Sequence, residues 1–137
     1  MPFPSGRLSL WLTLDAVIGI GPVTASRLLA RFDGDIKALF ECDDGGLRAL
    51  GLQSSQIQQL RWPLPVVELG LNWAAMPGNH LICPDDPVYP DLLKEIPAAP
   101  LLLYCRGNVA ALSLPQLAMV GTRHPTYAGK DNAARLC

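Results

Sequence analysis

Leu14 to Leu29, with the sequence LDAVIGIGPVTASRLL, places a glycine-rich break between two apolar segments and decides the first part of the fold. The apolar run before the break predicts a helix over residues 8–18. Pro22 suits the first turn of a second helix, because its missing N–H costs nothing at that position. Ala25 and Leu29 then recur at helical spacing and predict a buried face.

Further short helices are expected after this pair. Asp35 can cap one of them by accepting backbone N–H groups, and Ser55 with Gln58 forms a candidate capping box for another. The expected helices cover residues 36–41, 47–50, 56–61 and 66–76. The tryptophans lie in apolar helical stretches and are expected in the core: Trp11, Trp62 and Trp73. Residues 1–76 therefore predict a small all-helical domain.

The pattern changes after residue 76, where short apolar runs bounded by Gly and Pro predict strands. These runs cover residues 80–83, 101–105 and 116–120. Strands that alternate with helical segments predict a parallel, doubly wound, Rossmann-like sheet. The expected fold class is therefore α + α/β, with a helical domain at 1–76 and a Rossmann-like domain at 77–137. We expect the second domain to be incomplete, because the helix predicted at its end lacks a terminating signal.

Charge and cysteine content exclude several function classes. Charged residues make up 17% of the chain and hydrophobic residues 50%, which argues against a disordered tail. The net charge is −1, but the last third, residues 101–137, is net positive and is better placed to meet an anion. The four cysteines form no C-x-x-C pair, which disfavours a zinc site and indicates reduced thiols. No apolar run reaches the ~18 residues of a membrane span, so we expect a cytoplasmic protein without a membrane partner.

The glycine-rich break after Val17 resembles a helix-hairpin-helix motif. Gly19 and Gly21 would allow a tight hairpin with positive φ, whose N–H groups beside a helix N-terminus could contact a phosphate. Few basic residues accompany the motif, mainly Arg27 and Arg31. Because phosphate affinity comes mainly from Lys and Arg, a structural or partner-binding role is favoured over direct DNA contact.

A second candidate anion site follows the expected strand at 116–120. A strand that runs into a glycine-containing loop and then a helix is the usual anion cradle of doubly wound folds. Gly121 would give the turn, Thr122 a hydroxyl, Arg123 a planar phosphate-binding fork, and Gly129 a close backbone approach. His124 could add a phosphate or base contact. The loop is neither G-x-G-x-x-G nor a Walker A sequence, and an ordinary strand-to-helix turn with an exposed arginine is the alternative.

The second half of the chain resembles the DNA-processing protein A (DprA/Smf) family, of which we expect an amino-terminal fragment. The resemblance rests on Tyr89-Pro90-x-x-Leu93-x-x-Ile96-x-x-x-Pro100-x-x-Leu103-Tyr104-x-x-Gly107, followed by Val120-Gly121-Thr122-Arg123-x-Pro125-Thr126-Tyr127-x-Gly129. Two positions depart from the family pattern, where Ala99 replaces an acidic residue and Asn108 replaces an aspartate. Both are expected turn positions.

The resemblance implies a non-enzymatic protein without a cofactor. Family members carry a sterile-alpha-motif-like or helix-hairpin-helix domain before the Rossmann-like domain. They bind single-stranded DNA in natural transformation and help load the RecA recombinase, and a homodimer is expected of the full-length protein. By resemblance, Gly121, Thr122 and Arg123 would contact the DNA backbone, while Gly129 would shape the loop.

Two other functions remain open at this point. One is a Rossmann-like nucleotide hydrolase of the phosphoribohydrolase type, which would need a further phosphate loop and a catalytic Glu. The other is a protein-interaction module formed by the helical region. The paired carboxylates Asp43-Asp44 and Asp85-Asp86 are interpreted as solvated turn residues, so no catalytic or metal-binding residue is assigned.

Overall fold

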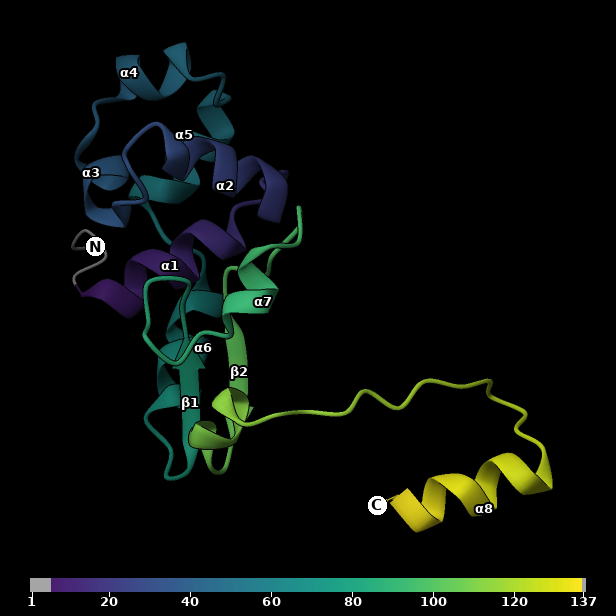
Figure 1. Cartoon of the computed structure of the whole chain (residues 1–137). Helices are drawn as coiled ribbons and strands as arrows, with labels where there is room; N and C mark the ends of the chain where they lie inside the picture. Colours follow the sequence, from purple (N-terminus) through teal and green to yellow (C-terminus); the bar gives the residue numbers. More distant parts are fainter. Residues whose placement is uncertain (1–5, 137) are drawn as a thin grey trace.

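The computed structural model describes residues 6–136 and is mostly helical, with one small sheet (Figure 1). Its elements, in chain order, are α1 (Arg7–Ala16), α2 (Pro22–Ala30), α3 (Ile36–Glu41), α4 (Asp44–Ala49), α5 (Ser54–Arg61), α6 (Pro65–Ala74), β1 (Asn79–Ile82), α7 (Asp91–Lys94), β2 (Leu103–Arg106), the 3-10 helix η1 (Val109–Ser113) and α8 (Tyr127–Leu136).

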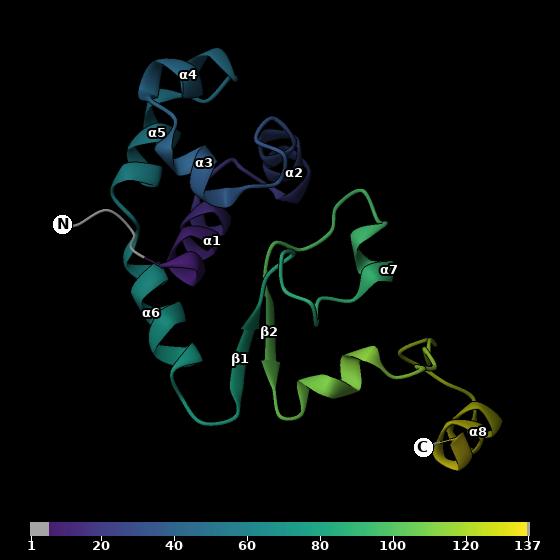
Figure 2. The same ribbon diagram turned by 60° about the vertical axis from the view of Figure 1, so that its left-hand side comes forward.

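Helix α1 lies at the centre of the helical part and packs against α2, α3, α5 and α6. Leu14 is fully buried and Trp11 is 1% exposed. All residues from Ser9 to Leu14 are buried. The segment therefore has no solvent-facing stripe, and its one buried threonine, Thr13, donates its hydroxyl to the carbonyl of Ser9 across 2.7 Å. Figure 2 shows α2 to α5 gathered on one side of α1, with α6 leading down to the sheet.

The contact between α1 and α6 depends on a residue without a side chain. Gly70 lies in α6, and a Cβ built on it would approach the Cδ2 of Leu12 to 2.7 Å. Leu12 is itself 4% exposed and packed in the core. The glycine therefore lets two helix backbones come closer than an alanine would permit.

The helix ends follow local capping rules in part. The side chain of Asp35 accepts from the backbone N–H groups of Lys37 and Ala38, which confirms the predicted cap of α3. The predicted capping box at Ser55 and Gln58 is wrong: the box is formed by Gln53 and Gln56. Gln53 directly precedes α5, and its backbone N–H donates to the side chain of Gln56 across 2.9 Å. Ser55 therefore lies inside the first turn of the helix and not at its cap.

The predicted tryptophan positions are confirmed for Trp11 but not for Trp62. Trp62 is 56% exposed, because it forms the C-cap of α5 just before Pro63, outside the helical periodicity. Trp73 is partly buried and packs on Tyr104, with 5.1 Å between the ring centroids.

The two strands pair with each other, and they run antiparallel. Asn79 lies opposite Arg106, and Ile82 lies opposite Leu103. The expectation of a parallel sheet is therefore wrong for these two strands. Parallel neighbours need a long crossover, usually a helix that lies along the sheet, whereas α7 is a single helical turn of four residues.

Strands β1 and β2, with the loop that joins them, form a hairpin that shares the core of the helical part. Leu81, Cys83, Leu101 and Leu102 belong to the same cluster of buried residues as the side chains of α1 to α6. The loop between the strands is closed by Tyr89, which is 2% exposed and whose hydroxyl donates to the carbonyl of Pro100 across 2.7 Å. The division of the chain between residues 76 and 77 stays a prediction.

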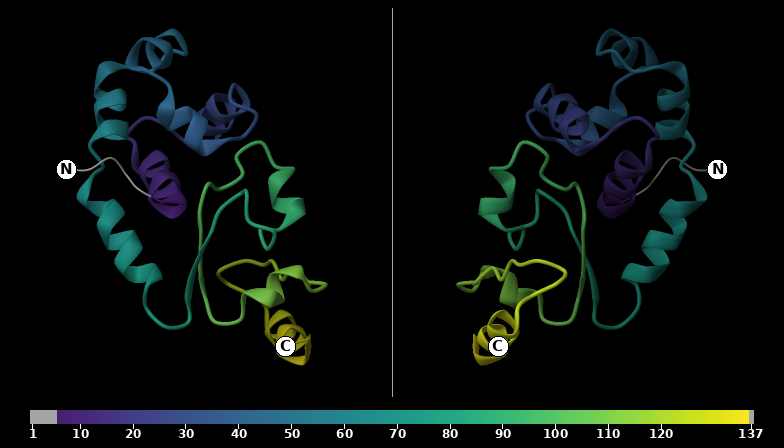
Figure 3. Two further views of the ribbon diagram at one scale, coloured as in Figure 1. Left: turned by 90° about the vertical axis from the view of Figure 1, so that its left-hand side faces the viewer. Right: turned by 90° about the vertical axis from the view of Figure 1, so that its right-hand side faces the viewer.

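After η1 the chain is extended and exposed as far as α8. Residues 116–120 form no strand, so the third predicted strand is wrong for the structure described. A strand needs a hydrogen-bonding neighbour, and β1 and β2 pair only with each other. Figure 1 shows α8 at the far end of this segment, apart from the rest of the molecule, and Figure 3 shows the same segment leaving from the end of the hairpin.

Candidate nucleic-acid interface

The loop predicted to bind DNA is fully accessible. Residues 121–126 are all exposed, and so is Tyr127 at the start of α8, at 90%. The guanidinium of Arg123 forms no ion pair with any carboxylate in the described part of the chain. It is therefore available to an anionic ligand without first having to leave a partner.

Two threonines organise the loop around Arg123. The side chain of Thr122 accepts from the backbone N–H of His124 across 3.2 Å, which forms a local turn. The side chain of Thr126 accepts from the N–H of Gly129 across 3.1 Å, so Thr126 is the N-cap of α8. The loop is held from both ends by hydroxyl groups, and Arg123 lies between them in the chain.

The two predicted loop glycines differ in their surroundings. A Cβ on Gly129 would lie 3.3 Å from the Thr126 hydroxyl oxygen, so this glycine leaves room for the cap. A Cβ on Gly121 would meet nothing within 4 Å, and Gly121 has no positive φ. Gly121 is open backbone here, without the turn expected of it.

The charge around this loop favours an anion. The first turn of α8 holds no acidic residue, and Lys130 follows within the next turn. The N-terminus of α8 also carries the positive end of the helix dipole, which favours an anion at this loop. Of the charged pairs near the loop, Arg135 is bound to Asp131 across 2.9 Å, which leaves Arg123 and Lys130 as the cations at the helix start.

The glycine hairpin between α1 and α2 is a weaker phosphate site. Gly19 has a positive φ of 85°, as predicted, but Gly21 has a φ of −88° and the expectation for it is wrong. The backbone N–H of Ile18 donates to the side chain of Gln59 across 2.9 Å, and that of Ile20 donates to Val17. Because these donors are already used within the chain, fewer remain for a ligand.

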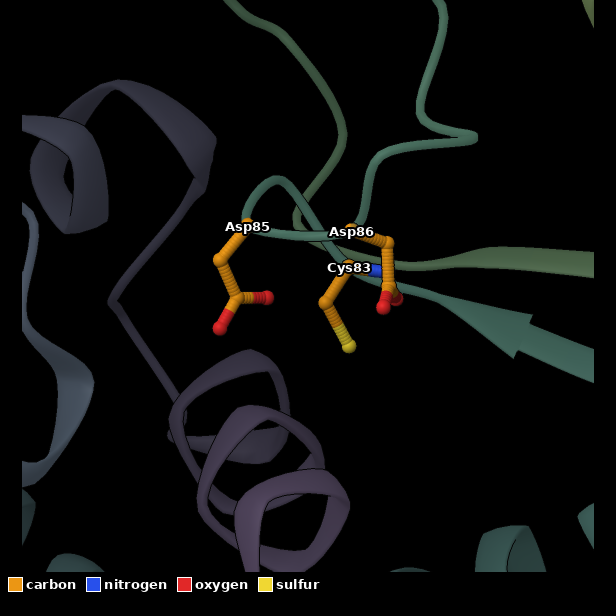
Figure 4. Close-up of side chains that lie close together, drawn as sticks. All are labelled: Cys83, Asp85 and Asp86. Atoms are coloured by element: carbon orange, nitrogen blue, oxygen red, sulfur yellow. The ribbon is translucent and has the colours of Figure 1, made fainter.

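Sequence reasoning missed a cluster that joins two distant segments. Figure 4 shows the side chains of Cys83, Asp85 and Asp86 in the loop after β1, close to the helix of α1. One ligand atom from each of these three residues lies within 4.8 Å of the others. Both carboxylates bind the guanidinium of Arg7, and Asp86 also accepts from the N–H of Cys83 across 2.7 Å.

This cluster is organised as an ion pair rather than as a metal site. Burial raises the pKa of the Cys83 thiol to about 12, with Asp86 and Asp85 adding to the rise while Arg7 opposes it. A protonated thiol is a poor metal ligand, and the two carboxylates already have a cation. The interpretation of Asp85 and Asp86 as solvated turn residues is therefore incomplete: they lie in a turn, but they hold Arg7. No local sequence signal links residues so far apart.

Two further expectations concern the membrane and the thiols. No helix among residues 6–136 is long and apolar enough to cross a membrane. Cys42, Cys83 and Cys105 are free thiols, of which Cys83 is buried and the other two are partly buried. Cys137 lies outside the described residues.

Comparison with known proteins divides the chain into two matched regions. Residues 7–64 match the family model described as the SMF/DprA SAM domain, and residues 80–137 match that described as DNA recombination-mediator protein A. The Protein Smf of Synechocystis sp. (strain ATCC 27184 / PCC 6803 / Kazusa) is 32% identical over 130 residues, which cover 87% of this chain and 31% of the relative. The Protein Smf of Escherichia coli (strain K12) is 35% identical over 92 residues, which cover 66% of this chain and 25% of the relative.

The chain thus spans about a third or less of the length of these curated relatives. No solved structure matches the chain at a significant level.

Proposed function

This chain belongs to the DprA/Smf family, and from that premise we propose that it binds single-stranded DNA through residues 121–129 as part of a recombination mediator. The observation that carries the proposal is the free, exposed guanidinium of Arg123 beside the N-terminus of α8. Arg123 pairs with a phosphate, while Lys130 adds charge and backbone N–H groups near Gly121 donate to its oxygens.

The mode of binding follows from the side chains present. A guanidinium reads the phosphate and not the base, so affinity is largely independent of sequence and falls with salt. Tyr127 is 90% exposed and offers a ring on which a base can stack. His124, also exposed, adds a phosphate contact when it is protonated.

The role of the bound strand is taken from the family. We propose that the protein passes single-stranded DNA to the RecA recombinase during natural transformation, acts as a homodimer in the cytoplasm, and catalyses no reaction. The exposed apolar stretch that includes Leu117, Met119 and Val120 supports a further contact of this segment, since Val120 is 94% exposed. Such a stretch is suited to pairing with another strand.

The test is single-stranded DNA binding by the native chain and by Arg123→Ala, measured by fluorescence anisotropy of a labelled oligothymidylate. Loss of a charged hydrogen bond should weaken binding by about ten-fold or more. Arg106→Ala is the matched control, because Arg106 is also an exposed arginine of the positive last third but lies on β2. Equal affinities for all three chains would remove Arg123 from the interface.

A further inference from the structure

A second surface, on the helical part, carries unpaired positive charge around a hollow. Helices α2 and α4 border a hollow of about 490 Å³, and both lie in the upper half of the molecule, away from α8 (Figure 2). Arg27 and Arg31 line this hollow, together with Leu28, Ala49 and Leu50. We refer to these five residues as the arginine hollow.

The two arginines form a pair on one helix face. Arg27 lies in α2 and Arg31 is the C-cap that follows its last residue, so the two lie about one turn, or about 6 Å, apart along the helix axis. Both are exposed, and neither forms an ion pair with a carboxylate among the described residues. Arg48 is also exposed and forms no ion pair among the described residues. It directly precedes Ala49, so a third cation lies next in sequence to a residue that lines the hollow.

Three acidic residues at the starts of α3 and α4 already have partners within the chain. Asp35 accepts the first N–H groups of α3, and Asp43 accepts the N–H of Gly46. Asp44 pairs with Arg61 across 3.0 Å. No acidic residue lines the arginine hollow, so the charge of Arg27 and Arg31 is not neutralised by the residues that form it.

The lining of the hollow distinguishes between classes of anion. Surfaces that bind single-stranded nucleic acid combine basic residues with aromatic rings on which bases stack. No aromatic side chain lines this hollow within the described chain; its other lining groups are small or aliphatic, as at Leu28 and Leu50. Arginine beside a desolvated apolar surface is typical of protein interfaces.

We propose that the arginine hollow docks an acidic peptide segment of a protein partner. Two carboxylates of that segment pair with Arg27 and Arg31, and an apolar side chain between them enters the hollow against Leu28 and Leu50. This surface is separate from the loop at 121–129, so the protein can hold a partner protein and a DNA strand at the same time.

The experiment uses the whole chain and a labelled short peptide in which Asp and Leu alternate. The native chain should bind this peptide, and Arg27→Glu/Arg31→Glu should weaken the binding by at least about ten-fold, because two charged hydrogen bonds are replaced by repulsion. Arg106→Glu, which reverses one exposed charge outside the hollow, is the control and should keep the native affinity. A peptide with Lys in place of Asp should not bind, and thermal unfolding of each variant checks that the exposed substitutions leave the fold intact.

Three outcomes would overturn the proposal. The first is no binding of the Asp-Leu peptide to the native chain, and the second is an equal loss in Arg106→Glu. The third is displacement of the peptide by oligothymidylate together with loss of oligothymidylate binding in Arg27→Glu/Arg31→Glu, which would assign the hollow to nucleic acid. Arg123→Ala should leave peptide binding unchanged, so failure of this proposal and failure of the DNA proposal are distinguishable.

Discussion

Arg7 hydrogen-bonds Asp86, which lies 79 positions further along the chain, with 2.6 Å between Nη2 and Oδ1. Its other terminal nitrogen binds Asp85. This double contact ties the first turn of α1 to the loop that leaves β1. The helical part and the hairpin are therefore joined by an ion pair as well as by a common core.

Arg7→Ala should lower the free energy of unfolding by about 1 kcal/mol, measured by urea denaturation. A charged hydrogen bond contributes more than this when buried, but the Arg7 side chain is 38% exposed and solvent screens the pair. Arg48→Ala is the control, since Arg48 is exposed and unpaired within the described chain, and it should change stability by less than about 0.5 kcal/mol. Equal effects of the two substitutions would show that the ion pair of Arg7 with Asp85 and Asp86 contributes nothing to stability.

Gly70→Ala should destabilise the chain by about 1–2 kcal/mol. The new methyl group would press on Leu12 in a closed core, and overpacking outweighs the better helix propensity of alanine. Gly45→Ala, in α4, is the matched control: its Cβ would meet only the Asp43 carboxylate at 3.5 Å, an ordinary contact. Thermal unfolding should show a lower midpoint for the first variant and an unchanged or higher one for the second; a stabilised Gly70→Ala would refute the close approach of α1 and α6.

Stability should fall at alkaline pH because of one buried thiol. Cys83 is fully buried, and burial raises its pKa from an ordinary 9.0 to about 12. Between these values the unfolded chain has released the proton while the folded chain still holds it, so folding is favoured fully below pH 9.0 and loses that contribution as the pH rises towards about 12.

Urea unfolding at a series of pH values checks this. The decline over that range should be shallower in Cys83→Ala than in the native chain, after allowance for its cavity at neutral pH. Cys105→Ala is the control, since Cys105 is partly buried on β2 and should retain the native slope. A native decline that Cys83→Ala leaves unchanged would assign the alkaline effect to other groups, such as Tyr89 and Tyr104, whose pKa values burial also raises.

The helical part could be predicted from sequence because its signals are local. Asp35 lies directly before α3 and caps it, and Pro22 opens α2 where the missing N–H is harmless. Even here the prediction for α5 is wrong, because serine is the commoner N-cap residue and the sequence pattern favours Ser55, whereas the structure has Gln53 at that position.

The remaining features depend on partners distant in sequence. The apolar run at 116–120 has the composition of a strand, but composition does not supply the neighbour that a strand needs. The antiparallel pairing of β1 with β2 depends on how the intervening loop turns, and that loop is closed by a hydrogen bond from Tyr89 to Pro100, residues that lie 11 positions apart. The exposed position of Arg123 agrees with the sequence expectation, whereas the cluster of Arg7 with Asp85 and Asp86 left no local trace.

The most direct test of the DNA-binding proposal is the salt dependence of oligothymidylate affinity for the native chain and for Arg123→Ala. For a single strand, each neutralised phosphate contributes about 0.7 to the slope of log affinity against log salt. We predict that Arg123→Ala binds more weakly and has a slope shallower by about that amount, while Arg106→Ala matches the native slope. A native slope in Arg123→Ala would contradict the proposal, because it would mean that this guanidinium meets no phosphate.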